Sequence, residues 1–258
     1  MTIGIMGAMH EEVALLKEKM HIEATCIIGG REYYQGELFD HKIVLVLSKI
    51  GKVASAITAT LLIQHFDIDY VMFMGVAGAG NPNVNVGDVV VADFLLQHDV
   101  DVRPFYKPHE IAVLNKALFE TDKKLAQRLL RATEHFLQHD LNADVESVSL
   151  EKFSIKSPKA HFATIASGDQ FIQDVTLLND IHHRVRSAQD VLLGCVEMEG
   201  AAVAQVCYEL NTPCVVVRTI SDNANHSAAI DFNAFLQEVA SHYALGIIKE
   251  FFKKLSKN

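Results

Sequence analysis

Short apolar runs alternate along this chain with amphipathic stretches, and this alternation constrains the fold more than any other feature. Its clearest instance is the segment Val191–Leu210, where an apolar run ends at Val196 and a helical stretch begins near Ala201. The helical stretch repeats apolar residues at the spacing of one helix face, at Val203, Val206, Cys207 and Leu210. Strands that alternate with helices in this way predict an α/β fold with a mixed, mostly parallel central sheet flanked by helices.

The other segments continue the alternation. Further strands are expected at residues 3–6, 42–47, 70–74, 88–94, 160–166 and 214–218. Further helices are expected at residues 11–20, 53–65, 125–137, 174–185 and 232–255. A hairpin is expected where Thr25–Ile28 and Arg31–Leu38 flank Gly29-Gly30, and it makes the central sheet mixed. The small residues Gly75–Gly80 predict a loop whose backbone can approach another group closely.

Length and composition fit one domain. With 258 residues, 50% of them hydrophobic, the chain can bury one large core, so a single domain over residues 1–258 is expected. The region 106–159 is the least well predicted, because residues 141–158 are polar and only the helix at 125–137 stands out. This region is therefore a candidate insertion.

Charge and motifs exclude several classes of function. A net charge of −9 argues against a nucleic-acid partner. No apolar run is long enough to span a membrane, and the first residues indicate a strand, not a signal peptide, so a cytoplasmic protein is expected. The four cysteines form no CxxC pair and the thirteen histidines show no metal-ligand spacing, so no metal is expected. Without a glycine-rich dinucleotide or phosphate loop, no cofactor is expected either.

Ionisable residues stand near the ends of several predicted strands. They are Glu12, Glu199, Arg218 and Asp222. Because the carboxyl ends of parallel strands share one edge, these side chains should border one cleft. If the chain stays extended past the strand, alternation turns Glu197 and Glu199 to opposite sides. Three carboxylates and one guanidinium suit acid–base cleavage of a glycosidic bond, in which one carboxylate activates water and another protonates the leaving group.

Four motifs carry a resemblance to a known family. They are Gly4-Ile5-Met6-Gly7-Ala8-Met9, Ser167-Gly168-Asp169-Gln170-Phe171, Val196-Glu197-Met198-Glu199-Gly200-Ala201 and Arg218-Thr219-Ile220-Ser221-Asp222. In this order they resemble the 5′-methylthioadenosine/S-adenosylhomocysteine nucleosidases of the purine nucleoside phosphorylase-like superfamily. The resemblance covers nearly the whole chain and is weak only within residues 106–159. It implies a homodimeric hydrolase that cleaves the N-glycosidic bond of these two nucleosides to give adenine and the 5-thioribose product.

The resemblance also implies roles for the ionisable residues. Glu12 matches the base for the attacking water. Asp222 matches the acid that protonates adenine N7, and Ser221 holds its side chain. Glu199 matches the carboxylate on the ribose hydroxyls, and Arg218 matches a residue near Glu199 and the water site.

The remaining matches concern the substrate. Met198 matches a residue packed on the sugar, Phe171 the ring stacked on adenine, and Ile172 the residue whose backbone binds the purine edge. The apolar pocket for the 5′-alkylthio group matches Met9, Ile50 and Phe232. We also expect substrate contacts from Ala77 and Gly78. Val102 and Phe105 resemble the lid that reaches into the site of the partner subunit.

One departure from the family pattern concerns the attacking water. Position 76, where many members carry Ser, is Val76 here, which removes a hydroxyl that could contact the water or the ribose.

Three alternative functions remain. A nucleoside phosphorylase would need a cationic clamp for phosphate, whereas the turn Gly7–Glu12 is acidic and favours water. A hydrolase of 6-amino-6-deoxyfutalosine in menaquinone synthesis is compatible with the same motifs. A nucleoside sensor or dinucleotide-binding module is disfavoured by the retained acids and by the missing glycine fingerprint.

Overall fold

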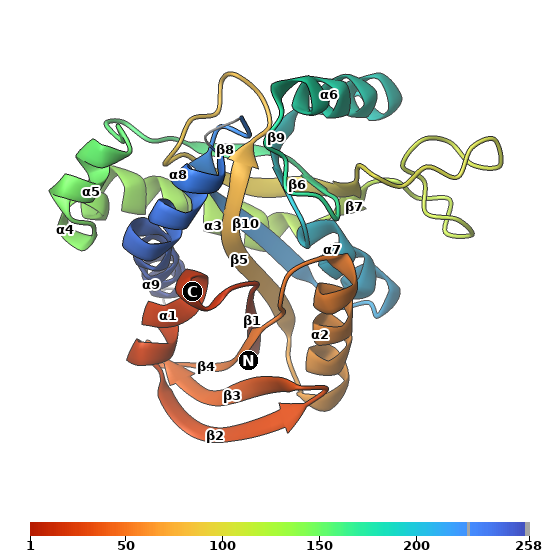
Figure 1. The fold of residues 1–258 in the computed structure, drawn as a ribbon. Coiled ribbons are helices and arrows are strands. Elements are labelled where there is room, and N and C mark those ends of the chain that lie inside the picture. The colour runs from red at the N-terminus through yellow and green to blue at the C-terminus, as the bar shows by residue number, and fades with distance from the viewer. Residues whose placement is uncertain (226–227, 256–258) are drawn as a thin grey trace.

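A ten-stranded mixed sheet forms the centre of the molecule, and helices lie on both of its sides (Figure 1). The computed structural model describes residues 1–225 and 228–255. The strands are β1 (Thr2–Gly7), β2 (His21–Ile28), β3 (Arg31–Leu38), β4 (His41–Leu47), β5 (Tyr70–Ala79), β6 (Val89–Gln97), β7 (Phe119–Glu120), β8 (Ala160–Ser167), β9 (Leu193–Glu197) and β10 (Cys214–Asp222).

The helices confirm most of the predicted segments. They are α1 (His10–Lys19), α2 (Lys52–His65), α3 (Lys123–His135), α4 (Leu141–Asp144), α5 (Ser147–Lys152), α6 (Val175–Gln189), α7 (Gly200–Glu209), α8 (Ala228–Phe235) and α9 (Ser241–Leu255). Two π-helical turns, Phe136–Asp140 and Leu236–Ala240, follow α3 and α8. The closing helix predicted at 232–255 is thus α8, a π-helical turn and α9 in succession.

Part of the sheet closes on itself. Strands β5, β10, β6, β8 and β9 pair in a ring, and β1, β4, β3 and β2 extend from β5 in that order. Among the described residues, five of the ten strand pairs are parallel and five are antiparallel, so the sheet is mixed, as predicted. The parallel pairs β1–β5 and β5–β10 nevertheless bring three carboxyl ends to one edge. Strand β9 meets this edge with Val196 opposite Gly78.

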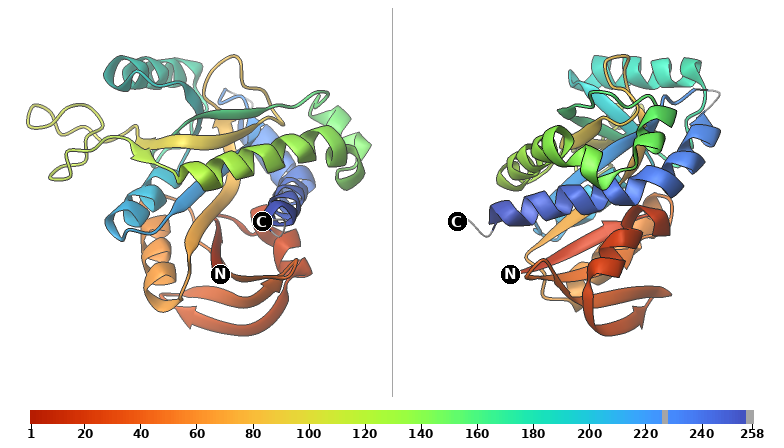
Figure 2. Two further views of the ribbon diagram at one scale, coloured as in Figure 1. Left: turned by 180° about the vertical axis from the view of Figure 1, so that it is seen from behind. Right: turned by 90° about the vertical axis from the view of Figure 1, so that its left-hand side faces the viewer.

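The two faces of the sheet build separate cores, since successive strand residues point to opposite faces. Ile3 and Ile5 of β1 pack into one core with residues of α1, α3 and α9. Met6 packs into the other core with residues of α2 and α7. Figure 2 shows α3 and α9 on the same side of the sheet.

The loop predicted at Gly75–Gly80 is largely strand, so this prediction was wrong. Residues 75–77 pair with residues 218–220 of β10, and residues 78–79 pair with β9. The close approach predicted for these small residues is confirmed at Gly75. A Cβ on Gly75 would lie 2.6 Å from Oε1 of Glu12, so glycine is what allows this carboxylate to reach β5.

The region 106–159 packs against the body of the protein. Leu141, Val145 and Leu150 are buried in the core that contains α3 and α9. Between β6 and β7 a long connection projects from the body (Figure 1). Within the described residues, no helix has the length and apolar character needed to cross a membrane.

Candidate active site

A cavity of about 250 Å³ opens at the edge where the strand ends meet. It is lined by Ala8, Met9, Glu12, Ile50, Val76, Ala77, Gly78, Gln170, Phe171, Ile172, Val196, Glu197, Met198, Glu199, Asp222 and Phe232. Most of these side chains are apolar, and four carboxylates interrupt them. The cavity therefore combines an apolar wall with acids, which suits a partly apolar ligand that undergoes acid–base chemistry.

Glu12 lies in the first turn of α1 and is buried, with 4% of its surface exposed. Its Oε2 accepts hydrogen bonds from the backbone N–H groups of Ala8 at 2.7 Å and Met9 at 2.9 Å. Its Oε1 accepts from the N–H of Val76 at 3.0 Å. Burial raises the pKa of Glu12, while the charge of Arg218 and these three N–H groups lower it. The backbone thus holds the carboxylate in one orientation at the cavity wall.

Asp222 ends β10 and is also buried. Its Oδ2 accepts a hydrogen bond from Ser221 Oγ at 2.8 Å, and its Oδ1 accepts one from the N–H of Ala224 at 2.8 Å. Burial raises the pKa of Asp222, and these two hydrogen bonds act in the opposite direction. Ser221 does not line the cavity but fixes the carboxyl group that does.

Glu199 is the third predicted acid in the cavity wall. Its Oε1 accepts a hydrogen bond from the N–H of Gly51 at 2.7 Å. Burial, and then the negative charge of Glu197, raise the pKa of Glu199 to about 8, although Arg218 acts against them. The side chain is therefore mostly protonated at neutral pH when the cavity holds no ligand.

Glu197 and Glu199 do not point to opposite sides of a strand. Strand β9 ends at Glu197, and Glu199 adopts φ −138° and ψ −40° at the start of α7. The alternation rule applies only to an extended chain, so it stops before Glu199. Both carboxylates consequently line the same cavity.

Arg218 lies behind the cavity wall, with 1% of its surface exposed. Its Nε and Nη2 donate to Oε2 of Glu197 at 3.1 Å and 2.6 Å. Sequence reasoning placed Arg218 near Glu199 and gave Glu197 no role. The signal that could have identified Glu197 is the buried cation itself, because a buried guanidinium needs a buried anion.

The predicted apolar residues line the cavity together. Phe171 and Phe232 pack edge to face with ring centroids 5.4 Å apart. Ile50 and Phe171 are partly open to solvent, whereas Ile172 is buried. Ala77, Gly78, Met9 and Met198 also line the cavity. Within one chain Val102 and Phe105 do not line it, and Phe105 is 84% exposed on the projecting connection.

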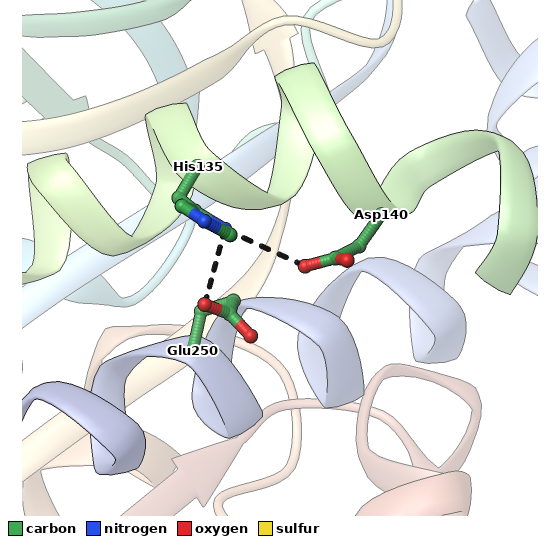
Figure 3. A group of neighbouring side chains, drawn as sticks. All are labelled: His135, Asp140 and Glu250. Carbon is green, nitrogen blue, oxygen red and sulfur yellow. Dashed lines mark ion pairs between the residues drawn. The ribbon is translucent and has the colours of Figure 1, made fainter.

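A histidine and two carboxylates meet elsewhere, between the end of α3 and α9 (Figure 3). Nδ1 of His135 lies 3.1 Å from Oε2 of Glu250 and 3.6 Å from Oδ2 of Asp140. Lys253 pairs with the other oxygen of Glu250, and the side chain of His135 is 43% exposed. None of the residues of this cluster lines the cavity. The absence of a metal remains a prediction.

Known proteins share this arrangement of the chain. A family model described as the phosphorylase superfamily matches residues 2–253. A 5′-methylthioadenosine/S-adenosylhomocysteine nucleosidase from Psychromonas ingrahamii is 35% identical over 99% of this chain and 100% of its own. The structure of the same kind of nucleosidase from Streptococcus pneumoniae, with the transition-state inhibitor MT-ImmA, is 34% identical in sequence and has a TM-score of 0.80. The match covers 99% of this chain and 100% of the other. A futalosine hydrolase of Helicobacter pylori is 32% identical and has a TM-score of 0.78, and the match covers 98% of this chain and 97% of the other.

The raised pKa of Glu199 predicts a pH-dependent stability. Between its ordinary value of 4.5 and about 8, the folded protein holds a proton that the unfolded chain has lost. The contribution of Glu199 to the free energy of unfolding is therefore fully present below pH 4.5 and is lost as the pH rises through 8. We expect Glu199→Gln to have a larger free energy of unfolding than the native protein at pH 8, by about 1–3 kcal/mol, and a smaller difference at pH 5.

Urea unfolding at pH 5, 6.5 and 8 measures this difference. The control is Glu209→Gln, which removes an exposed carboxylate from the same helix, α7, and should show no such trend. A stability difference for Glu199→Gln that does not grow with pH would contradict the prediction.

Proposed function

Because this chain belongs to the 5′-methylthioadenosine/S-adenosylhomocysteine nucleosidase family of the phosphorylase superfamily, we propose that it hydrolyses the N-glycosidic bond of these two nucleosides and releases adenine and the 5-thioribose product. One observation carries the proposal: four buried carboxylates line the cavity, and none of the described residues that line it is Lys or Arg. Phosphate as the nucleophile needs cationic ligands. Water needs a base, which a carboxylate supplies.

Glu12 is the base in this proposal. The N–H groups of Ala8, Met9 and Val76 hold its two oxygens, so the carboxylate reaches the water in a fixed orientation. Deprotonated Glu12 takes a proton from the water as the water attacks C1′ of the ribose. Val76 offers its backbone N–H to Glu12 and has no hydroxyl for the water, so the water depends on fewer side-chain contacts than a serine at this position would allow.

Asp222 is the acid. Burial raises the pKa of its carboxyl group, which favours the protonated form, and Ser221 and Ala224 orient that group. Proton transfer from Asp222 to N7 of adenine makes the base a neutral leaving group as the C1′–N9 bond breaks. The ribose then carries oxocarbenium character, which a nearby carboxylate stabilises.

Glu199 and the apolar wall bind the rest of the nucleoside. Glu199 accepts hydrogen bonds from the ribose hydroxyls, and Met198 packs on the sugar. Phe171 stacks on adenine, whose hydrogen-bonding edge meets the backbone of Ile172. The 5′-alkylthio group is apolar and fits against Met9, Ile50 and Phe232, since thioether and aromatic groups pack favourably.

A homodimer completes the site in this proposal. Phe105 is 84% exposed on the projecting connection, and Val102 lies on the same connection. Burying this side chain against a partner would remove a large apolar surface from water. We propose that Val102 and Phe105 of one subunit cover the cavity mouth of the other, near Ile50 and Phe171.

The remaining expectations concern the location of the protein, its insertion, its cofactors and an alternative substrate. A cytoplasmic location, an insertion within residues 106–159, and the absence of cofactor and metal stay predictions. Hydrolysis of 6-amino-6-deoxyfutalosine is the second candidate function, because a futalosine hydrolase shares the fold at 32% identity. Relative turnover of the two nucleosides decides between them, and we expect 5′-methylthioadenosine to be preferred.

Replacing the acid tests the proposed chemistry. Asp222→Asn keeps an acceptor for the N–H of Ala224 but cannot protonate adenine, so kcat/KM should fall about 100-fold or more. The measurement is adenine release from 5′-methylthioadenosine in phosphate-free buffer. Asp190→Asn, at an exposed left-handed position after α6, should leave the rate unchanged. Equal rates for Asp222→Asn and the native protein would contradict the assignment.

Truncating the lid tests the dimer. Phe105→Ala removes an apolar group from the partner's cavity mouth, so KM should rise about tenfold while kcat changes little. Val113→Ala is the matched control, because Val113 is 81% exposed on the same connection. A monomer in sedimentation analysis, or equal KM values for both variants, would argue against the shared site.

A further inference from the structure

Glu197 is a carboxylate in the cavity wall that has no part in the proposed reaction. Its side chain is only 2% exposed, and both of its oxygens already accept hydrogen bonds. Oε2 accepts from Arg218 and from the N–H groups of Glu199 at 3.1 Å and Gly200 at 2.8 Å. Oε1 accepts from Ser167 Oγ and again from the N–H of Gly200, at 3.0 Å. The carboxylate has no lone pair left for a nucleoside.

These bonds join three segments that are distant in sequence. Ser167 ends β8, Gly200 begins α7, and Arg218 lies in β10. Ser167 Oγ also accepts a hydrogen bond from the N–H of Ala201 at 2.7 Å, and the carbonyl of Glu197 accepts one from the N–H of Gly168 at 3.0 Å. Three of the four sequence motifs therefore meet at one carboxylate.

The first consequence is the position of Glu199. Its backbone N–H is held by Glu197, and its carboxylate is held by the N–H of Gly51. Glu199 has a non-helical backbone at the start of α7, where no helical hydrogen bond fixes its N–H. Glu197 thus supplies the backbone anchor for the carboxylate that faces the ribose.

The second consequence is the position of the charge on Arg218. The guanidinium lies 4.2 Å from the ring centroid of Phe73, and its shortest hydrogen bonds go to Glu197. Burial raises the pKa of both Glu12 and Glu199, and from this place the charge of Arg218 acts to lower both, whereas the charge of Glu197 acts to raise the pKa of Glu199. The buried ion pair of Arg218 and Glu197 therefore contributes to the electrostatic field at Glu12 and Glu199, the two carboxylates that face the substrate.

We propose that Glu197 is a positioning residue of this site: it anchors the start of α7 beneath Glu199 and holds Arg218 at the place from which its charge acts on Glu12 and Glu199, without binding the nucleoside itself. This role rests on the nucleosidase function proposed above.

Glu197→Gln tests the role, because it keeps the shape of the side chain and removes its charge. Its single amide oxygen replaces two carboxylate oxygens, which weakens the hold on Arg218 and on the N–H groups at the start of α7, so kcat/KM for adenine release should fall about 100-fold. Loss of the charge leaves Arg218 to act alone on Glu199, so the titration midpoint of Glu199 should move to lower pH. Carboxyl carbon-13 resonances, assigned with Glu199→Gln, report this midpoint in the protein without substrate.

Glu250→Gln is the matched control. Glu250 is also a buried carboxylate in an ion pair, with 3% of its surface exposed, but it lies between α3 and α9, away from the cavity. The Glu250→Gln variant should have a lower melting temperature than the native protein, with kcat/KM and the titration midpoint of Glu199 unchanged. A folded Glu197→Gln variant with native kcat/KM overturns the proposal. A loss of activity with an unmoved midpoint overturns it too, because it leaves Glu197 a packing role only.

Two other outcomes, a Glu197→Gln variant that does not fold and a failure of the proposed function, can be told apart from a failure of this proposal. If Glu197→Gln does not fold, Glu197→Asp keeps the charge but is too short to reach Arg218 and α7 together. We then expect a folded protein with kcat/KM about tenfold lower, and native kcat/KM would overturn the proposal. Failure of the proposed function appears differently, as no adenine release from the native protein. The midpoint of Glu199 still tests Glu197 in that case.

Discussion

The site depends on one buried cation held among buried carboxylates. Arg218 has 1% of its surface exposed and is paired with Glu197. A guanidinium buried without a partner would cost several kcal/mol, and so would Glu197 alone. The charge of Arg218 acts on Glu12 and Glu199, and the charge of Glu197 acts on Glu199, while burial at the end of β10 raises the pKa of Asp222. Acids in different environments can therefore act as base and acid in one cavity.

The fold makes this arrangement by bringing strand ends together. Parallel pairing of β1, β5 and β10 sets Glu12, Gly75 and Asp222 at one edge, and β9 crosses the same edge beside Gly78. Glycine at position 75 leaves room for the carboxylate of Glu12 to reach the N–H of Val76. The acids stay fixed because backbone N–H groups, which the fold positions, donate most of their hydrogen bonds.

The sequence predicted most of the strands and helices, since apolar periodicity is a local signal, but it did not predict β7, α4 or α5. Glu12, Glu199 and Asp222 all line the cavity as expected. The extension of β5 through Gly75–Ala79 was missed, because small residues favour loops unless partners on both sides pair with them. The partner of Arg218 was missed for a different reason. Arg218 needs a buried anion only because it is itself buried, and its burial is a property of the folded structure that the sequence does not show.

The central claim is that water, not phosphate, attacks the nucleoside. The most direct test is to incubate the native protein with 5′-methylthioadenosine and phosphate in water enriched in oxygen-18, and to analyse the sugar product by mass spectrometry. The account predicts free 5-methylthioribose carrying one oxygen-18 atom, formed at a rate that does not depend on phosphate. A sugar 1-phosphate, formed only when phosphate is present, would contradict it.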